Sequence, residues 1–162
     1  MDQSAIPVID LAPFIQGSDT DRKAVAGRVD RACRETGFFT IVGHGVPETL
    51  IAETRTAMLD FFARPLREKL AIARPSEEVS RGYNRLADQA LSYSMGEAAP
   101  PDLQESFAIG PVDARPPASY AGQGADHLYA PNLWPEGSVA LRHHLEAYYR
   151  VVRGLAGSQI KM

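Results

Sequence analysis

The histidines and the carboxylates near them are the residues whose types could hold a metal ion. A site with two histidines and one carboxylate commonly begins with His-x-Asp or His-x-Glu on a strand, where residues i and i+2 point to the same side. His144-Leu145-Glu146 has this spacing. The apolar residues around it repeat with the period of a helix, in which two residues turn through roughly 200° and aim the side chains apart. We therefore expect no metal site there.

The remaining histidines offer no better set of ligands. His143 is a helical neighbour of His144, so at least one of the two is expected to be solvated. His127 follows Asp126 in a predicted loop, and no second ligand stands at a metal-like spacing. His44 lies between two glycines at a predicted strand end, where a hydrogen-bonded structural role is expected. The sequence predicts no metal ligand and no catalytic residue.

Arg81 and Tyr83 flank Gly82 at the edge of a predicted loop and are the candidate substrate-binding residues. A guanidinium can bind a carboxylate through two parallel hydrogen bonds, and a phenol can donate or accept one. The alternative interpretation is a packing tyrosine beside a surface arginine. Both interpretations stay open on the sequence alone.

Composition limits the class of protein. The chain has 162 residues, 44% of them hydrophobic, and a net charge of −3, which suits one globular domain and speaks against a nucleic-acid partner. Cys33 is the single cysteine, so we expect a reducing compartment, and on a helix face it reads as a small buried hydrophobe. No signal peptide and no membrane span are expected, which predicts a cytoplasmic protein without a membrane partner.

The elements that would position these residues are arranged around one stretch. Phe38, Phe39, Ile41 and Val42 form a predicted buried strand between Gly37 and Gly43, and Pro47 opens the next helix. Other strands are predicted at 6–11 (at a sheet edge because of Pro7), 81–84 and 104–110, and loops at 90–102 and 111–131.

Apolar residues at helical spacing predict the helices. One begins at Ser18, Asp19 or Thr20 and ends at Gly37, with Val25, Val29, Ala32 and Cys33 on one face. A second runs from Pro47 to about Ala63 on Leu50, Ile51, Thr54, Met58, Phe61 and Phe62. A shorter one follows Pro65 with Leu66, Leu70 and Ile72, and the last begins near Ser138. The predicted fold class is α+β, with helices packed on a small partial β-sheet.

Several motifs together resemble the N-terminal region of the isopenicillin N synthase-like oxygenases, which are non-haem iron, 2-oxoglutarate-dependent dioxygenases. The motifs are Ile6 to Leu11, Thr36-Gly37-Phe38-Phe39 with His44 to Pro47, Phe61-Phe62 with Pro65 and Lys69, Arg81-Gly82-Tyr83, Glu105-Ser106-Phe107 with Gly110, and Asn132 to Pro135. They run in the family's order over nearly the whole chain. Gly43 departs from the family, in which many members place asparagine before the His-Gly pair.

The resemblance implies an oxidoreductase lineage whose cofactors, Fe(II) and 2-oxoglutarate, are held by a jelly-roll core. The His-x-Asp, distal histidine and Arg-x-Ser elements of that core have no counterpart here, so no metal or cofactor ligand is carried over. The resemblance places residues 1–156 in the family's N-terminal domain, with 157–162 as a tail where the core would begin. It also places Arg81 and Tyr83 near the mouth of the family's active site.

Three interpretations follow from this resemblance. The chain is a truncated oxygenase region that is inactive alone, a stand-alone interaction or dimerisation module, or one half of a split oxygenase that a separate core completes. In the chain by itself, strand edges and helix faces built to meet a jelly roll would lack cover. We expect marginal stability, self-association or dependence on such a partner.

Overall fold

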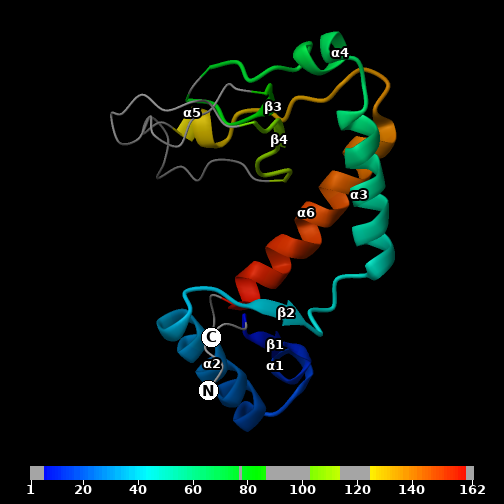
Figure 1. Cartoon of the computed structure of the whole chain (residues 1–162). Coiled ribbons are helices and arrows are strands. Elements are labelled where there is room, and N and C mark those ends of the chain that lie inside the picture. Colours follow the sequence, from blue (N-terminus) through cyan, green and yellow to red (C-terminus); the bar gives the residue numbers. More distant parts are fainter. Residues whose placement is uncertain (1–5, 77, 87–102, 114–124, 160–162) are drawn as a thin grey trace. The chain divides into compact units, whose positions relative to one another are not determined.

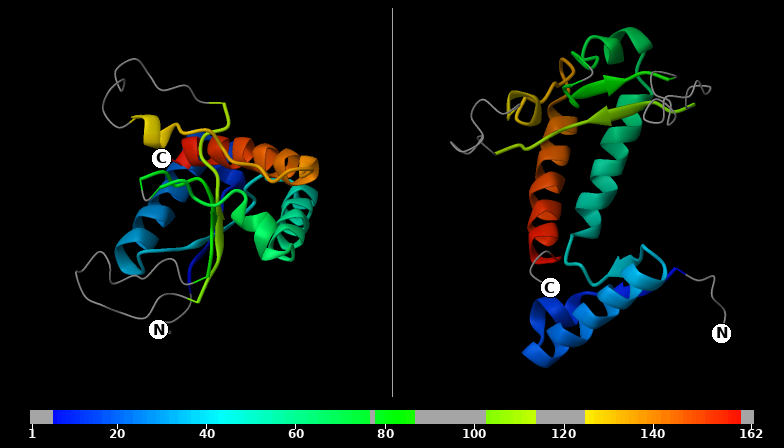
Figure 2. Two further views of the ribbon diagram at one scale, coloured as in Figure 1. Left: turned by 90° about the horizontal axis from the view of Figure 1, so that it is seen from above. Right: turned by 90° about the vertical axis from the view of Figure 1, so that its left-hand side faces the viewer.

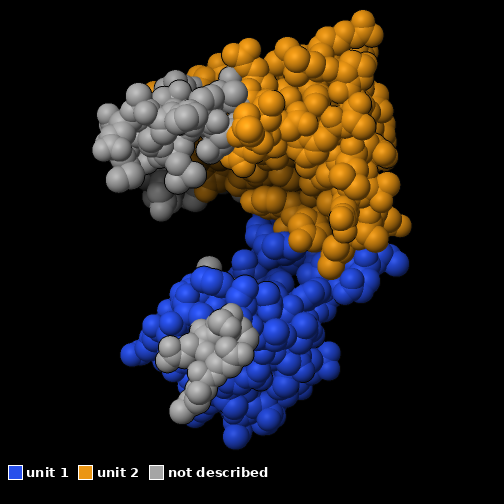
Figure 3. Space-filling view, in the orientation of Figure 1, with its two compact units in different colours: residues 1–49, 151–162 blue, residues 50–150 orange. Residues whose placement is uncertain are grey.

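The computed structural model describes residues 6–76, 78–86, 103–113 and 125–159. The chain divides into two compact units, residues 1–49 with 151–162 (unit 1) and residues 50–150 (unit 2), which are coloured separately in Figure 3. The loop predicted at 90–102 lies outside the described residues, as does part of the one predicted at 111–131. Each unit is built around its own two-stranded sheet.

Unit 1 contains the strands β1 (Val8–Asp10) and β2 (Thr40–Val42) and the helices α1 (Ala12–Gln16) and α2 (Asp19–Glu35), labelled in Figure 1. The two strands are parallel, with Ile9 paired to Ile41. Ser18 caps α2 in a capping box, in which its side chain accepts from the Asp21 N–H and the Asp21 carboxylate accepts from the Ser18 N–H. The helix ends just before Gly37, whose φ of 82° lies in the left-handed region. Both predicted helix ends are confirmed.

The core of unit 1 is apolar. Ile9, Leu11, Val25 and Ala32 are buried, and Phe14, Val29, Phe39, Ile41 and Leu155 pack against them. The prediction of a fully buried strand at 38–42 is wrong. Phe38 is 58% exposed and Val42 47%, because β2 has three residues, pairs only with β1 among the described strands, and alternates its side chains between a covered and an open face.

The prediction that Cys33 is a buried hydrophobe is also wrong. The side chain is exposed, whereas the preceding residue, Ala32, faces the core. One residue along a helix turns by about 100°, and this rotation carries Cys33 off the buried face of α2. The buried stripe of α2 is therefore narrower than the apolar stripe in its sequence.

Unit 2 holds most of α3 (Glu48–Phe62), then α4 (Leu66–Leu70), β3 (Gly82–Asn84), β4 (Ser106–Ala108), α5 (Ala125–Leu128) and the first part of α6 (Val139–Gln159). β3 and β4 are antiparallel, with Tyr83 opposite Phe107. The two long helices α3 and α6 lie side by side in Figures 1 and 2, and the Thr54 hydroxyl lies 3.5 Å from the carbonyl oxygen of His144.

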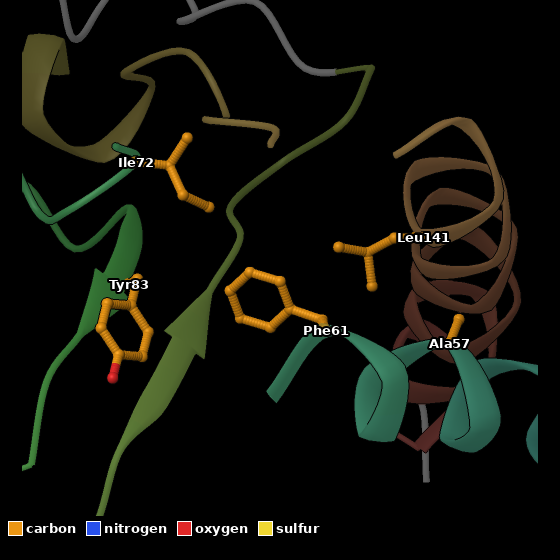
Figure 4. Close-up of a cluster of buried hydrophobic side chains, with 5 residues drawn as sticks. All are labelled: Ala57, Phe61, Ile72, Tyr83 and Leu141. Atoms are coloured by element: carbon orange, nitrogen blue, oxygen red, sulfur yellow. The ribbon is translucent and has the colours of Figure 1, made fainter. Parts of the chain in front are cut away.

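The core of unit 2 gathers around one aromatic ring. Phe61 is almost fully buried among Ala57, Ile72, Tyr83 and Leu141, as Figure 4 shows. Its ring centroid lies 4.8 Å from that of Phe107. The mixture of helices with little sheet confirms the predicted fold class in its coarse form, although the strands form two separate pairs.

The apolar faces predicted for the two helices before β3 are confirmed in part. In α3, Thr54 and Phe61 are buried as expected. In and just after α4, Ile72 is buried, but Leu66 and Leu70 are exposed, and the buried residue of the helix is Lys69. Among the described residues, none of the helices is both long and apolar enough to cross a bilayer.

Candidate functional site

A cluster of polar side chains in unit 2 includes both candidate residues and is the candidate site. Hydrogen bonds join Tyr83 of β3 to Glu105, which directly precedes β4, and Glu105 to Lys69 of α4. Arg81 directly precedes β3 and binds a separate set of backbone carbonyls. Gly82 allows this arrangement, because it has a φ of 91° and a Cβ there would collide with the carbonyl oxygen of Ile72. The same close approach lets the Tyr83 N–H donate to that oxygen at 2.9 Å.

One carboxylate oxygen accepts from two buried donors. The Tyr83 hydroxyl donates to Glu105 Oε2 at 2.5 Å, and Lys69 Nζ donates to the same oxygen at 2.7 Å. Lys69 Nζ also donates to the Phe62 carbonyl at 2.9 Å and lies 5.3 Å from the centroid of the Tyr83 ring. The cluster thus ties α4, β3 and the start of β4 together.

The electrostatics of this cluster keep the carboxylate charged. The hydrogen bond from Lys69 lowers the pKa of Glu105 below its ordinary value, and the hydrogen bond from Tyr83 lowers it further. An ionised Glu105 has only acceptor atoms, and its Oε2 already receives two donors. In this structure the group acts as a fixed anion that orients Tyr83 and Lys69.

Arg81 is 6% exposed, and its guanidinium binds backbone carbonyls. Nη1 donates to Ser80 at 2.7 Å, Nε donates to Ala130 at 3.2 Å, and Nη2 donates to Leu128. Because the last two acceptors, Ala130 and Leu128, are 49 and 47 residues along the chain, the side chain fixes the α5 segment to β3. This arrangement favours a positioning role, and substrate binding by Arg81 stays a prediction.

Gly110 and Asn132 complete the cluster on the side of Arg81. A Cβ on Gly110 would collide with the guanidinium, so only glycine leaves room for it. The Gly110 N–H donates to Asn132 Oδ1 at 2.7 Å, and Asn132 Nδ2 donates back to the Gly110 carbonyl at 3.2 Å. Two polar anchors therefore hold residues 128–132 against the sheet.

The structure buries both sequence candidates, and it adds residues that the sequence argument did not select as site residues. Tyr83 is 2% exposed, so substrate contact through its hydroxyl also stays a prediction. The added residues are Lys69 and Glu105. Lys69 stands three residues from both Leu66 and Ile72, in the short helix that was predicted from its apolar residues. A charged residue at helical spacing within an apolar stripe was the signal that could have found it.

The histidines contact neighbouring residues in the structure. His44 Nδ1 accepts from the Val46 N–H at 3.1 Å, which confirms its structural role. Glu146 pairs with Arg142 at 2.8 Å, and His144 Nδ1 lies 3.7 Å from Glu53. Within the described ranges, no group of three histidine, cysteine, aspartate or glutamate side chains is placed to hold a metal ion. These residues do not fit an Fe(II) site.

The order of these elements and motifs matches a known family. Residues 6–137 match the family described as the non-haem dioxygenase in morphine synthesis N-terminal domain. The chain belongs to this family. The match begins just before β1 and ends just before α6, so it takes in the four strands of the described residues and the polar cluster.

Curated relatives of this dioxygenase N-terminal domain are longer proteins named as a hydroxylase, an oxidoreductase and a dioxygenase. The chain is 31% identical to homoarginine-6-hydroxylase 2-ODD-233 of Oryza sativa subsp. japonica, over 96% of this chain and 47% of that protein. It is 34% identical to the 2-oxoglutarate-Fe(II) type oxidoreductase hxnY of Emericella nidulans, over 96% and 44%, and 31% identical to validamycin A dioxygenase of Streptomyces hygroscopicus subsp. limoneus, over 98% and 42%. It spans less than half the length of these relatives.

Solved structures show the same fold. The crystal structure of a full-length Neurospora crassa protein in complex with alpha-KG superposes with a TM-score of 0.75 at 22% identity, over 98% of this chain and 46% of that one. A 2OG-Fe(II) oxygenase family protein from Caulobacter crescentus gives a TM-score of 0.74 at 21% identity, over 97% and 47%. The N-terminal domain therefore has the fold found in part of these larger proteins.

Proposed function

We propose that this chain is the N-terminal portion of a 2-oxoglutarate- and Fe(II)-dependent oxygenase and does not turn over substrate alone. The observation that carries the proposal is the family match over residues 6–137. When bound, the cofactors of such an oxygenase couple the oxidation of 2-oxoglutarate to succinate and CO₂ with the oxidation of a substrate by O₂. The relatives are named for chemically unrelated substrates, such as homoarginine and validamycin A, so the proposal concerns the type of reaction.

A core carrying the iron and 2-oxoglutarate ligands is the proposed partner. Two observations support this role: the relatives are more than twice the matched length, and the described residues do not fit an Fe(II) site. Exposed apolar side chains of unit 1, among them Ile6, Val8, Phe38 and Val42, provide a surface that such a core would cover. Among the described residues the β1–β2 sheet has two strands, and its edges would pair with strands of the core.

Turnover and iron binding test the catalytic part of the proposal. The purified chain is incubated with Fe(II), 2-oxoglutarate and ascorbate under air, and succinate formation and bound iron are measured. We expect neither succinate above the level without protein nor stoichiometric iron. Stoichiometric iron together with iron-dependent succinate formation would show that the chain is an autonomous enzyme and would overturn the proposal.

Translation of the DNA that follows codon 162, in all three frames, separates the three origins of the chain. A series of His-x-Asp, a distal histidine and Arg-x-Ser continuing there supports a single oxygenase chain. A separate neighbouring gene for that core supports a split oxygenase, in which the two purified chains together restore turnover. A stand-alone interaction module is the outcome if neither is found.

Solution behaviour tests the exposed surface of unit 1. If it needs cover, the isolated chain should self-associate or melt at a temperature that rises with protein concentration. Analytical ultracentrifugation and melting curves over a hundredfold concentration range would measure this. A monomer with a sharp, concentration-independent transition would contradict the need for a partner.

A further inference from the structure

A groove in unit 2, separate from the polar cluster, runs between α3 and the start of α6 and has a volume of ≈ 400 Å³. The buried residues Ala57, Phe61 and Leu141 belong to its lining and make it apolar at the base. Charged and polar side chains of both helices stand along its walls. A ligand for this groove therefore needs an apolar part together with complementary charges.

Ser138 lines the groove at the residue that directly precedes α6. It is 7% exposed, and its Oγ has no hydrogen-bond partner among the residues that the structure describes. A serine at this position commonly caps the helix by accepting from a backbone N–H two or three residues later, but here no such bond is made. A buried hydroxyl without a partner is costly, so a ligand atom that bonds to it gains affinity.

The start of α6 adds positive character beside this hydroxyl. The first N–H groups of a helix have no acceptor within it, and the helix dipole makes this end partly positive. No acidic side chain stands in the first turn of α6 to offset it. Arg64, from just after α3, lines the same groove and makes no ion pair with any described carboxylate. This end of the groove suits a carboxylate.

The α3 wall of the groove carries the opposite charge. Glu53 and Asp60 both line it, seven residues apart on one face of the helix. Glu53 Oε2 lies 3.7 Å from His144 Nδ1, whereas Asp60 has no cationic partner within the described chain. These carboxylates would repel a simple anion but would attract an ammonium group.

We propose that the groove binds a small zwitterionic amino acid with an aliphatic side chain. Its carboxylate meets Ser138, the start of α6 and Arg64. Its ammonium faces Asp60, and its side chain lies on the apolar base formed by Ala57, Phe61 and Leu141. An amino acid satisfies all three features of the groove together, and the site does not depend on the oxygenase function.

Titration of the ¹⁵N-labelled chain with L-leucine tests the site by NMR. Two matched probes each lack one charged group: 4-methylpentanoate lacks the ammonium, and 3-methylbutylamine lacks the carboxylate. We expect L-leucine to bind about tenfold or more tightly than either probe, with shift changes in residues 137–141 and 53–64. If 4-methylpentanoate bound as tightly as L-leucine, the proposal that the ligand is a zwitterion would be wrong. If L-leucine did not bind at millimolar concentration, the proposal of an amino-acid site would be wrong.

Variants separate binding from folding. Ser138→Ala, Arg64→Gln and Asp60→Asn should each weaken leucine binding by about three- to tenfold. Arg67→Gln, at an exposed residue of α4 outside the groove, should leave it unchanged. Ser138→Ala should also keep or raise the melting temperature, because it removes a buried hydroxyl without a partner. A lower melting temperature with unchanged leucine binding would show that Ser138 is a helix cap and would overturn its place in the site.

Discussion

The two units of this chain bury different kinds of side chain. The core of unit 1 contains aliphatic residues and phenylalanine, and the polar contacts around it, such as the capping box at Ser18, lie at the surface. Unit 2 buries Lys69 and Arg81 beside its aromatic core and supplies each with carbonyl or carboxylate acceptors. The stability of unit 1 therefore depends on apolar contact and helix capping. That of unit 2 also depends on the pairing of buried polar groups.

This difference is sharpest for two arginines that bind backbone carbonyls. Arg81→Ala in unit 2 leaves the carbonyls of Ser80, Leu128 and Ala130 without their donor, and we expect it to lower the free energy of unfolding by about 3–5 kcal/mol. Arg28→Ala in unit 1 removes one exposed bond to the Val8 carbonyl and should cost about 1 kcal/mol or less. Urea unfolding of both variants measures the contrast. Equal losses would contradict it.

The carboxylate of unit 2 should produce a smaller effect that depends on pH. Glu105→Gln weakens the bonds to Lys69 and Tyr83, and we expect a loss of about 1.5–3 kcal/mol at pH 7. Because the pKa of Glu105 is lowered in the folded state, its stabilisation is complete above the unfolded value of 4.5 and is lost as the pH falls through the folded value. At pH values below the folded pKa of Glu105, the free energy of unfolding of the variant should therefore approach that of the parent chain.

Asp21, an exposed carboxylate in unit 1, allows the pH dependence of stability to be compared between the two units. The hydrogen bonds from Ser18 also lower the pKa of Asp21, so its contribution is likewise lost on acidification. Asp21→Asn should change the acid limb of the stability curve less than Glu105→Gln does, because solvent screens Asp21. Unfolding curves between about pH 3 and pH 7 measure both. A larger change for Asp21→Asn would reverse the comparison.

The cap of α2 should contribute about 1 kcal/mol. Ser18→Ala removes the acceptor for the Asp21 N–H and should lower the stability of the chain by about that amount. Ser18→Gly, which lacks the same hydroxyl but suits the cap backbone, should cost only a few tenths of a kcal/mol. Chemical denaturation distinguishes the two. Equal losses would show that the hydroxyl bond, rather than the cap backbone, carries the effect.

Cys33 gives the smallest expected effect. Its thiol is exposed on α2, so a thiol reagent should modify it in the folded chain at nearly the rate seen in urea, with little change in melting temperature. Mass spectrometry of the labelled chain measures this. Protection of the thiol until the chain unfolds would restore the interpretation as a buried hydrophobe.

Local features of the fold were predictable wherever neighbouring residues decide them. The start of α2 at Ser18, its end before Gly37 and the hydrogen-bonded turn at His44 follow from residues a few positions apart. The family resemblance was predictable for a similar reason, because its motifs are short and occur in order. Burial was less predictable, since an apolar stripe does not show how much of it another element covers. Phe38, Cys33 and Leu66 are exposed for this reason.

The candidate site was predictable from the sequence only in part. The sequence alone determined the order of the elements, the family, and Arg81 and Tyr83 as residues to examine. Only the tertiary structure decided that Lys69 meets Glu105, 36 residues away, and that Arg81 binds the Ala130 carbonyl, 49 residues away. Pairings of this kind depend on which elements pack together. The free energy of packing is a sum of contacts over the whole unit, so no single residue or local motif in the sequence determines it.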